Sequence, residues 1–416
     1  METALDALAR DAGESPKKKL RILYVWDADY PWDIRTEKIA RALTAHGHEV
    51  HIAARNKAWR KTAEVLPEAT VHRMPPIRLV GKRLDNILGF PAFFSPRWIR
   101  LLDRIVRENR IDVIIVRDLP LCPTGIWVAR RRGIPVVWDM AEDYPGMMKA
   151  TWDAGRQGAF DILVRNPRAV QAIERYCLPR LDRIIVTVAE AGDRIVALGA
   201  DRHRISIVHN SPPVKNAEGN PARDTGTSDA PVRVVYLGIL ELPRGIGELL
   251  EAIAELRTSG ENFALTIIGG GRDEEILRDR ARALGLDESA VKFAGFVPHE
   301  QAIRMVAEAD IGVNPLHDSP VFQTCIPNKL FDYMAAGLPV VSSDMQACAR
   351  LLRETGAGEV FSAGDSSDLA SALKRLRDAA TRKKIGEQGR DAVKKRYNWE
   401  EDSRVLVETV ERAINA

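Results

Sequence analysis

The chain has 416 residues, and at roughly 150 residues per domain this length favours two domains. Its 45% hydrophobic and 29% charged residues are typical of a globular protein and exclude a fibrous or wholly disordered chain. The net charge of +3 hides an asymmetry: residues 1–210 hold 35 basic and 26 acidic residues, and residues 51–110 alone hold 13 and 5. This local excess favours an anionic surface or substrate, but no recognition motif accompanies it, so no nucleic acid is expected as a partner.

Three features favour a cytoplasmic protein. The basic run Lys17–Arg21 leads into a short apolar run that ends at Asp27 without a cleavage-like sequence, so we predict a first strand after a disordered tail of residues 1–18. No stretch approaches the roughly 20 apolar residues needed to cross a bilayer. The four cysteines are widely spaced and form neither a metal-type pair nor a redox pair. A reducing compartment is the simplest interpretation.

The first half alternates short β-branched runs with helical patterns. Runs that are apolar on both faces are typical of parallel strands covered by helices on both sides, so a Rossmann-like doubly wound domain is predicted over residues 19–211. Its predicted strands are Arg21–Trp26, Glu49–Ala53, Asp112–Val116, Pro135–Trp138, Arg183–Val188 and Ile205–Val208.

A second series follows a change in composition. Residues 212–230, within the Pro-, Gly- and Asn-rich run His209–Pro231, are predicted to be a linker. A second Rossmann-like domain is predicted over residues 231–396, and a C-terminal helix over residues 397–416 is expected to cross back to the first domain. Ligands of such sheets bind beyond the carboxyl ends of the strands, so a cleft is expected between the domains. The predicted strands are Val232–Leu237, Ala264–Ile268, Val291–Ala294, Asp310–Asn314 and Pro339–Ser342.

Two predicted helix starts carry an unexpected cation. Pro327 suits a helix start, and Lys329 lies in its first turn, three residues before Asp332. Arg244 stands where the helix after the strand Val232–Leu237 should begin. A cation there opposes the helix macrodipole at a cost of about 0.3–1 kcal/mol, unless a bound anion such as a phosphate reverses the sign. The alternative is that Lys329 pairs with Asp332 and Arg244 with Glu248 in solvent.

These segments together resemble the retaining GT-B glycosyltransferases, in particular those similar to glycosyltransferase family 4 (group 1). The resemblance covers the predicted C-terminal domain well and the N-terminal half in pattern only, chiefly at residues 112–120 and 133–145. It implies a GT-B fold of two Rossmann-like domains. The motifs that carry it are Tyr236–Gly238 with Arg244 and Gly245, Ile267–Gly271, Val291–Pro298 and Pro327–Val341.

The resemblance also implies a role for each matching donor-site residue. Arg244 and Lys329 would hold the diphosphate, and Asp332 the ribose hydroxyls. Phe296 and Val297 would contact the base, while Gly238 would allow close approach of the backbone.

Two positions depart from the family pattern. That pattern has two glutamates eight positions apart, whereas here the second is Asp332 and the first is Thr324. The loop 323–326 is therefore expected to meet the donor sugar with hydroxyl, amide and backbone groups. The basic residue usual after the strand glycine is replaced by Ile239, which leaves the diphosphate to Arg244 and Lys329.

Acids after a predicted strand are the candidates for catalysis. Many relatives have a histidine at the position of Ala141, and its neighbours Asp139, Glu142 and Asp143 are available to orient or deprotonate an acceptor hydroxyl. Glu142 and Asp139 are preferred over Asp143. The alternative for each of them is a strand-end or loop acid that caps a helix.

Acceptor-binding residues are expected after two other strands of the first half. Asp33 and Arg35 lie in the turn after the first strand, and Arg117 follows the strand Asp112–Val116. The pair at Asp27 and Asp29 looks like a metal-binding pair, but it fits solvation or acceptor binding better, so no metal is predicted. The glycines 269–271 lack the spacing and ribose acid of a dinucleotide fingerprint, so no nicotinamide cofactor is predicted either.

The predicted function is transfer of a sugar, in the hexosyltransferase class, from a nucleoside diphosphate donor to an acceptor hydroxyl. The resemblance implies retention, and protein cations in place of a metal would stabilise the leaving diphosphate. A lipid-linked or cell-envelope glycan is one acceptor considered. The alternatives are a sugar-nucleotide epimerase on the same fold and a non-catalytic nucleotide-sugar-binding protein, the latter suggested by the missing glutamate and histidine.

The basic excess raises a second hypothesis, that the protein docks on an anionic membrane at its inner face. Arg97, Arg100, Arg104 and Arg107 form one basic stripe of a predicted helix whose apolar stripe is assigned to the core. The aromatic stretch Ile87–Phe94 precedes this helix and suits the headgroup region. The alternative is a solvated helix face and a loop buried against its own domain.

Overall fold

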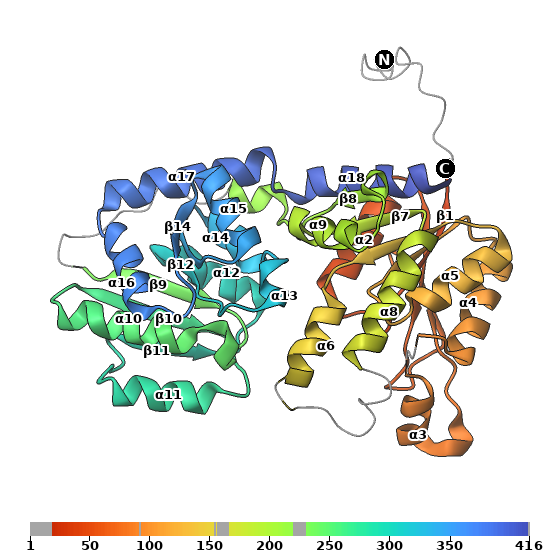
Figure 1. The fold of residues 1–416 in the computed structure, drawn as a ribbon, viewed down its shortest axis with the longest axis horizontal. Coiled ribbons are helices and arrows are strands. Elements are labelled where there is room, and N and C mark those ends of the chain that lie inside the picture. Colours follow the sequence, from red (N-terminus) through yellow and green to blue (C-terminus); the bar gives the residue numbers. More distant parts are fainter. Residues whose placement is uncertain (1–18, 91–92, 154, 156–165, 219–229, 415–416) are drawn as a thin grey trace, which may run out of the picture. The chain divides into compact units, whose positions relative to one another are not determined.

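The computed structural model describes residues 19–90, 93–153, 155, 166–218 and 230–414 (Figure 1). The chain divides into two compact units, one of residues 1–137 with 410–416 and the other of residues 138–409. Two sheets carry the fold, one of eight strands and one of six.

The first sheet has the strand order β3-β4-β2-β1-β5-β6-β7-β8. Strand β1 pairs in parallel with β2 and β5, while β3 runs antiparallel to β4 at one edge. Every residue of the central strands β5 and β6 is buried. The strands are β1 (Arg21–Val25), β2 (Glu49–Ala54), β3 (Ala63–Val65), β4 (Thr70–Arg73), β5 (Val113–Arg117), β6 (Val136–Met140), β7 (Arg183–Val186) and β8 (Ile205–Ile207).

Helices connect these strands, as expected for parallel neighbours that need a crossover. The α-helices are α2 (Ile34–Ala45), α3 (Gly81–Leu88), α4 (Pro96–Asn109), α5 (Cys122–Arg132), α6 (Tyr144–Asp153), α8 (Pro167–Cys177) and α9 (Ala189–Ala197). Short 3-10 turns are η1 (Arg78–Val80), η2 (Leu178–Arg180), η3 (Arg202–Arg204) and η4 (Val214–Ala217).

The second sheet has the order β11-β10-β9-β12-β13-β14, with parallel pairing throughout. The chain moves outward from β9 in one direction through β10 and β11, then returns to the other side of β9 for β12 to β14. Strand order thus reverses at β9, and such a switch point is where ligands of open α/β sheets bind. The strands are β9 (Val232–Leu237), β10 (Phe263–Ile268), β11 (Val291–Gly295), β12 (Ile311–Asn314), β13 (Val340–Ser343) and β14 (Gly358–Phe361).

The core of the second sheet is formed by inward residues of β9 to β11 together with α10, α11 and α16. Helix α14 packs against α12 and α17. The helical segments are η5 (Leu242–Arg244), α10 (Ile246–Thr258), α11 (Glu274–Ala283), α12 (His299–Glu308), α13 (Pro320–Gln323), α14 (Asn328–Ala336), α15 (Gln346–Thr355), α16 (Ser366–Arg375), α17 (Ala379–Lys395) and α18 (Trp399–Ile414).

The predicted fold class is confirmed: two sheets with interleaved helices lie where two alternating series were expected. Each predicted strand occurs, with ends shifted by two residues at most. Three strands were not predicted, namely β3, β4 and β14. The tail 1–18 and most of the predicted linker, residues 219–229, lie outside the described residues.

Candidate functional site

Five segments meet at one edge of the second sheet. They follow β9, β10, β11 and β12, and α14 begins beside them. Backbone hydrogen bonds tie three of the loops together: Gly238 N donates to Ile268 O, Leu240 N to Gly270 O and Gly269 N to Gly295 O. The edge is thus a connected surface of loops at the point where strand order reverses.

Glycines let the β9 and β10 loops come this close. Gly238 and Gly269 have backbone φ values of 149° and 138°, which residues other than glycine rarely adopt. A Cβ on Gly269 would lie 1.9 Å from Gly238 O, and one on Gly238 would lie 3.1 Å from Lys329 Nζ. The backbone of Gly238 therefore lies directly beside the Lys329 amino group.

Lys329 is a buried cation in the first turn of α14. Its residue is 8% exposed, and Nζ lies 3.9 Å from the centre of the Tyr236 ring. Nζ has no hydrogen-bond acceptor among the described residues. Burial, and secondly the positive charge of Arg244, hold the pKa of Lys329 well below its usual value. An unpaired buried amino group is costly, and an anion between Lys329 and Arg244 would remove that cost.

Arg244 ends η5, directly before α10. Its guanidinium lies 5.3 Å from the centre of the Phe322 ring. No ion pair joins Arg244 to Glu248 in the part of the chain that the structure describes, and the Glu248 carboxylate lies 2.9 Å from His317 Nε2 instead. The alternative pairing of Lys329 with Asp332 does not satisfy Nζ either. Both predicted cations therefore lie at this edge without a carboxylate partner among the described residues.

The loop after α13 presents a second unsatisfied polar atom. Thr324 Oγ1 is buried and has no hydrogen-bond partner among the described residues. Gln323, in contrast, is fully engaged: its Nε2 donates to Asp318 Oδ1 and its Oε1 accepts from Gln346 N. Burial raises the pKa of Cys325 to about 11, so its thiol stays protonated. The hydrogen bonds of Gln323 therefore hold the loop in place, while the Thr324 hydroxyl is left without a partner among the described residues.

The remaining predicted donor residues lie on the same edge. Asp332 is half-buried on α14, one turn after Lys329. Phe296, directly after β11, is 91% exposed, and Val297 beside it is half-buried. An exposed aromatic ring at the carboxyl end of a parallel strand has no packing role in its own domain.

The three predicted catalytic acids differ in their surroundings. Asp139 in β6 is fully buried, whereas Glu142 is exposed. Asp143 accepts from Gly146 N in the first turn of α6 and lies 3.5 Å from Arg194 Nε. Asp143 thus has the helix-capping role that was its alternative, and Glu142 is the one of the three acids that is exposed to solvent.

The predicted acceptor residues form one cluster at the ends of β1 and β5. Asp33 caps α2 by accepting from Thr36 N at 2.7 Å, and its carboxylate also pairs with Arg117. Arg117 donates to Thr36 Oγ1 and lies 4.2 Å from the centre of the Trp26 ring. Arg35 is buried on α2. Trp26 was not singled out from the sequence, although a tryptophan ending the first strand was a signal.

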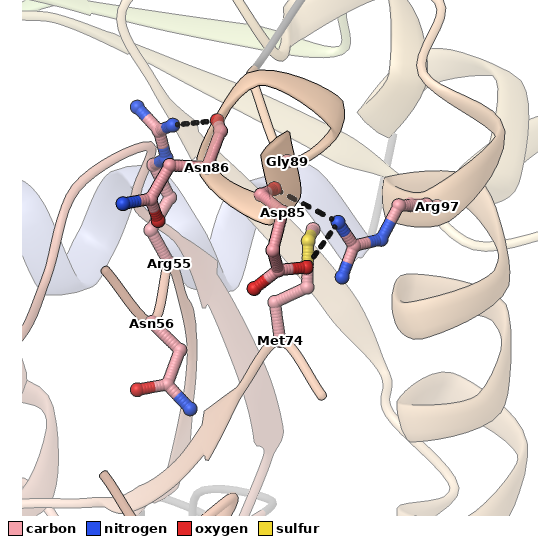
Figure 2. A pocket seen from close by; sticks show the side chains of 7 residues that line it. All are labelled: Arg55, Asn56, Met74, Asp85, Asn86, Gly89 and Arg97. Carbon is pink, nitrogen blue, oxygen red and sulfur yellow. Dashed lines mark hydrogen bonds and ion pairs between the residues drawn. The ribbon is translucent and has the colours of Figure 1, made fainter. Parts of the chain in front are cut away.

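Helix α3 is inverted relative to an ordinary surface helix. Its inward residue is Asp85, which accepts from Trp59 Nε1, Ile77 N and Arg97 and lines a small pocket with Arg55, Asn56, Met74, Asn86 and Gly89 (Figure 2). Its outward residues include Leu84, Ile87 and Leu88. The predicted basic stripe is wrong at Arg97, whose guanidinium turns inward to Asp85 and to Pro75 O. The predicted loop 87–94 is helical up to Leu88.

Comparisons with known proteins identify the chemistry. Residues 231–378 match the family model described as Glycosyl transferases group 1, and residues 33–211 match the one described as Glycosyl transferase 4-like domain. The protein is a glycosyltransferase, an enzyme that transfers sugars. These matches do not favour the epimerase or the non-catalytic alternative.

Similar proteins support this assignment. Glycogen synthase of Mycobacterium tuberculosis is 25% identical over 296 residues, which cover 71% of this glycosyltransferase and 67% of that relative. Phosphatidyl-myo-inositol mannosyltransferase of Mycobacterium leprae is 34% identical over 168 residues, 40% of this chain and under half (42%) of that relative. The structure of HepE from Anabaena in complex with UDP aligns with a TM-score of 0.69 at 15% identity, covering 94% of this chain and 100% of that one. Such neighbours share the GT-B fold.

Two features are absent from the described residues. No group of three or more His, Cys, Asp and Glu side chains in them is arranged to hold a metal ion. Within the same residues, no helix is both long and apolar enough to span a membrane.

Proposed function

We propose that this glycosyltransferase moves a sugar from a nucleoside diphosphate to an acceptor hydroxyl, with retention and without a metal ion. The observation that carries the proposal is the unpaired, buried Lys329 amino group beside Arg244 at the switch point of the second sheet. A diphosphate there would restore the charge of Lys329 and supply the acceptor that its amino group lacks.

The other donor residues fit the parts of a nucleotide sugar. Asp332 lies one turn along α14 and would accept hydrogen bonds from the ribose hydroxyls, and the exposed Phe296 ring would stack on the base. Thr324 Oγ1 is available to the sugar, in the position where the family pattern has a glutamate. HepE was solved with UDP, so uracil is the first base to test.

The reaction breaks the bond between the sugar C1 and the diphosphate oxygen, which leaves with the electron pair. The acceptor oxygen forms the new bond to C1 and gives up its proton. Lys329 and Arg244 would stabilise the charge that develops on the diphosphate, which is the task a metal ion performs elsewhere. Glu142 is exposed and so is the preferred group to orient the acceptor hydroxyl or take its proton; Asp139, fully buried, would act only through neighbours.

Calorimetry with UDP, GDP and ADP tests the donor site directly. We expect one nucleotide to bind wild type, and Lys329→Ala and Arg244→Ala each to weaken it. A nucleotide that binds both variants as tightly as wild type would refute the diphosphate assignment. Incubation with the matching nucleotide sugars and candidate acceptors then measures transfer itself.

We further propose that the protein works at an anionic membrane on its cytoplasmic side, with a lipid-linked or cell-envelope glycan as acceptor. The outward face of α3 and its surroundings is apolar, since Leu84, Ile87, Leu88, Phe94 and the preceding Leu79 are exposed. Between residues 69 and 102 Asp85 is the one acid, against six basic residues. Because Asp85 is held inward by Arg97, the exposed charges here are positive: Arg78, Lys82, Arg83 and Arg100.

The relative acting on phosphatidyl-myo-inositol supports a lipid-linked acceptor, and the chemistry of the surface supports an anionic bilayer. Each basic residue near an anionic leaflet contributes about 1 kcal/mol and is screened within a Debye length of roughly 8 Å at physiological salt. Binding is therefore expected to need both the apolar face and the basic residues.

Flotation with phosphatidylglycerol and phosphatidylcholine vesicles at two salt concentrations tests this surface. Wild type should bind the anionic vesicles at low salt, and Leu84→Ser/Ile87→Ser and Lys82→Glu/Arg83→Glu should each lose that binding. Ile276→Ser is the matched control, an equally exposed isoleucine on α11. Equal binding by all variants, or none by wild type, would contradict the proposal, and a concentration-dependent dimer lost in Leu84→Ser/Ile87→Ser would assign the face to a second copy.

A further inference from the structure

The loop between β1 and α2 exposes large apolar side chains that are not packed into the core. Trp32 is 66% exposed, and Ile34, the first residue of α2, is exposed beside it in sequence. This loop follows the carboxyl end of β1, where a doubly wound sheet binds its ligands. An indole ring left in water at such a position marks a contact surface.

The Trp32 side chain lies beside residues that are bonded to one another. The Trp32 ring lies 6.3 Å from the Trp26 ring, tilted by 48°. Arg117 lies over the Trp26 ring and is itself fixed by Asp33 and Thr36. Because Asp33 also caps α2, the helix start, the ion pair and both indoles form one connected unit.

Trp26 brings a second and independent observation. The residue is 7% exposed, and its buried Nε1–H has no hydrogen-bond acceptor among the described residues. A buried donor left without an acceptor costs about 1–3 kcal/mol, so a ligand oxygen at this position would be stabilising.

We propose that Trp32 and Trp26 form a saccharide subsite. The C–H face of a pyranose ring stacks on the Trp32 indole, and a ring hydroxyl oxygen accepts the Trp26 Nε1–H. The half-buried carboxylates of Asp27 and Asp29 follow Trp26 in the same loop and suit further sugar hydroxyls. That this sugar is the acceptor rests on the proposed function; that the site takes a saccharide does not.

The charges at this loop are largely compensated, because Arg117 pairs with Asp33 and the half-buried Arg55 interacts electrostatically with Asp27 and Asp29. This balance favours a neutral sugar over a phosphate or an anionic lipid. Residues 27–37 contain four acids, Asp27, Asp29, Asp33 and Glu37, and one base, the buried Arg35. This is the reverse of the α3 surface, where the exposed charges are basic. A stacking ring edged by carboxylates matches a pyranose, which is apolar on its C–H face and carries hydroxyls at its rim.

Saturation-transfer NMR with the methyl glycosides of glucose, galactose, mannose, rhamnose and N-acetylglucosamine tests the subsite. Wild type should bind at least one of them with millimolar affinity, and Trp32→Ala should weaken that binding at least tenfold. Trp127→Ala is the matched control: Trp127 is 40% exposed on α5 and has Arg131 5.4 Å from its ring centre, a pairing similar to that of Trp26 with Arg117. It should bind the glycoside as wild type does.

Calorimetry with UDP, GDP and ADP on the same samples separates this inference from the donor assignment. Trp32→Ala that keeps its nucleotide affinity and loses the glycoside supports the subsite. The subsite is overturned, whatever the nucleotide result, if wild type binds no glycoside of the panel at about 100 mM, which is roughly a hundredfold above a millimolar Kd. It is also overturned if Trp32→Ala binds a glycoside as tightly as wild type does. Loss of anionic vesicle binding in Trp32→Ala without loss of glycoside binding would assign Trp32 to the membrane and also overturns it.

Discussion

The donor edge of the second sheet and the Asp33–Arg117 cluster of the first are both polar sites at the carboxyl ends of parallel strands, yet they satisfy their charges in opposite ways. Asp33 and Arg117 bond each other and the start of α2. Lys329 and Thr324 are buried with a polar atom that no described residue satisfies. The charged pair of the first cluster is therefore satisfied within the fold, although the Trp26 indole beside it is not, whereas the cation of the donor edge has no acceptor among the described residues.

This difference predicts what substitutions do. Where charges are already paired, removing one should lower stability and leave donor binding intact. Where a buried charge has no partner in the free protein, removing that charge should weaken nucleotide binding and leave the stability of the free protein unchanged or higher. The outcomes below test that division, and the first concerns the acid that belongs to neither site.

Glu142→Gln should give the largest effect, a fall in kcat of about 10²- to 10⁴-fold, because we propose Glu142 as the general base and such a group typically contributes that much. Nucleotide affinity should not change, since Glu142 is exposed and bonded to neither donor cation among the described residues. Asp143→Asn is the control and should mainly lower stability, because Asp143 caps α6 and pairs with Arg194. Near wild-type turnover in Glu142→Gln would move the base to Asp139.

The sequence predicted the strand pattern well because burial on both faces leaves an unmistakable apolar run, as in β9. It failed where a strand carries no such run: all three residues of β3 are exposed, and β4 alternates. Helix α3 was also missed, because its outward leucines and isoleucine fit no amphipathic helix packed on a core.

At the donor site the sequence predicted which residues gather there, but not which of their polar groups are bonded and which lack a partner. Spacing alone could not show that Lys329 Nζ lacks an acceptor among the described residues. Nor could it show that Gln323 bonds Gln346, which is 23 residues away in sequence, as well as the nearby Asp318. The inward turn of Arg97 has the same cause: its partner Asp85 is on another helix.

Lys329→Met should weaken binding of the donor nucleotide by about 10- to 150-fold, because a charge-assisted hydrogen bond contributes about 1.5–3 kcal/mol. The variant without nucleotide should melt at the same temperature as wild type or higher, since an unpaired buried amino group is replaced by an apolar chain of similar length. Calorimetry and a thermal melt measure the two effects. A lower melting temperature together with unchanged affinity would make Lys329 a structural residue.

Asp33→Ala should show the opposite pattern. Losing the α2 cap costs about 1 kcal/mol. The buried Arg117 loses one of two carboxylate partners but keeps Asp118, which lies 3.4 Å from its Nε, so the further loss should stay below the roughly 3–5 kcal/mol of a fully broken buried pair. Urea unfolding should detect the loss, and nucleotide affinity should stay within about twofold of wild type (roughly 0.4 kcal/mol). Asp33→Asn keeps a capping oxygen and should recover part of the loss. A stable Asp33→Ala would show that the pair is formed for a ligand after all.

The smallest predicted effect is a proton taken up when nucleotide binds. Burial and Arg244 lower the pKa of Lys329 in the free protein, and a bound diphosphate should raise it again. Binding therefore adds up to one proton at any pH between the lowered pKa and roughly 10.4, the ordinary value, so affinity should fall as pH rises in this window. Over the same window the free protein should become more stable with rising pH, because the unfolded chain holds the proton that folded Lys329 has lost.

Calorimetry at pH 8 and above in two buffers of different ionisation enthalpy measures that uptake, since a phosphate group with a pKa of roughly 6 has finished titrating there. Lys329→Arg is the decisive control. An arginine stays charged even when buried, so it should bind nucleotide without proton uptake and should lower the stability of the free protein. If wild type and Lys329→Arg show the same buffer dependence, the proton comes from another group, and Lys329 is already charged before the nucleotide arrives.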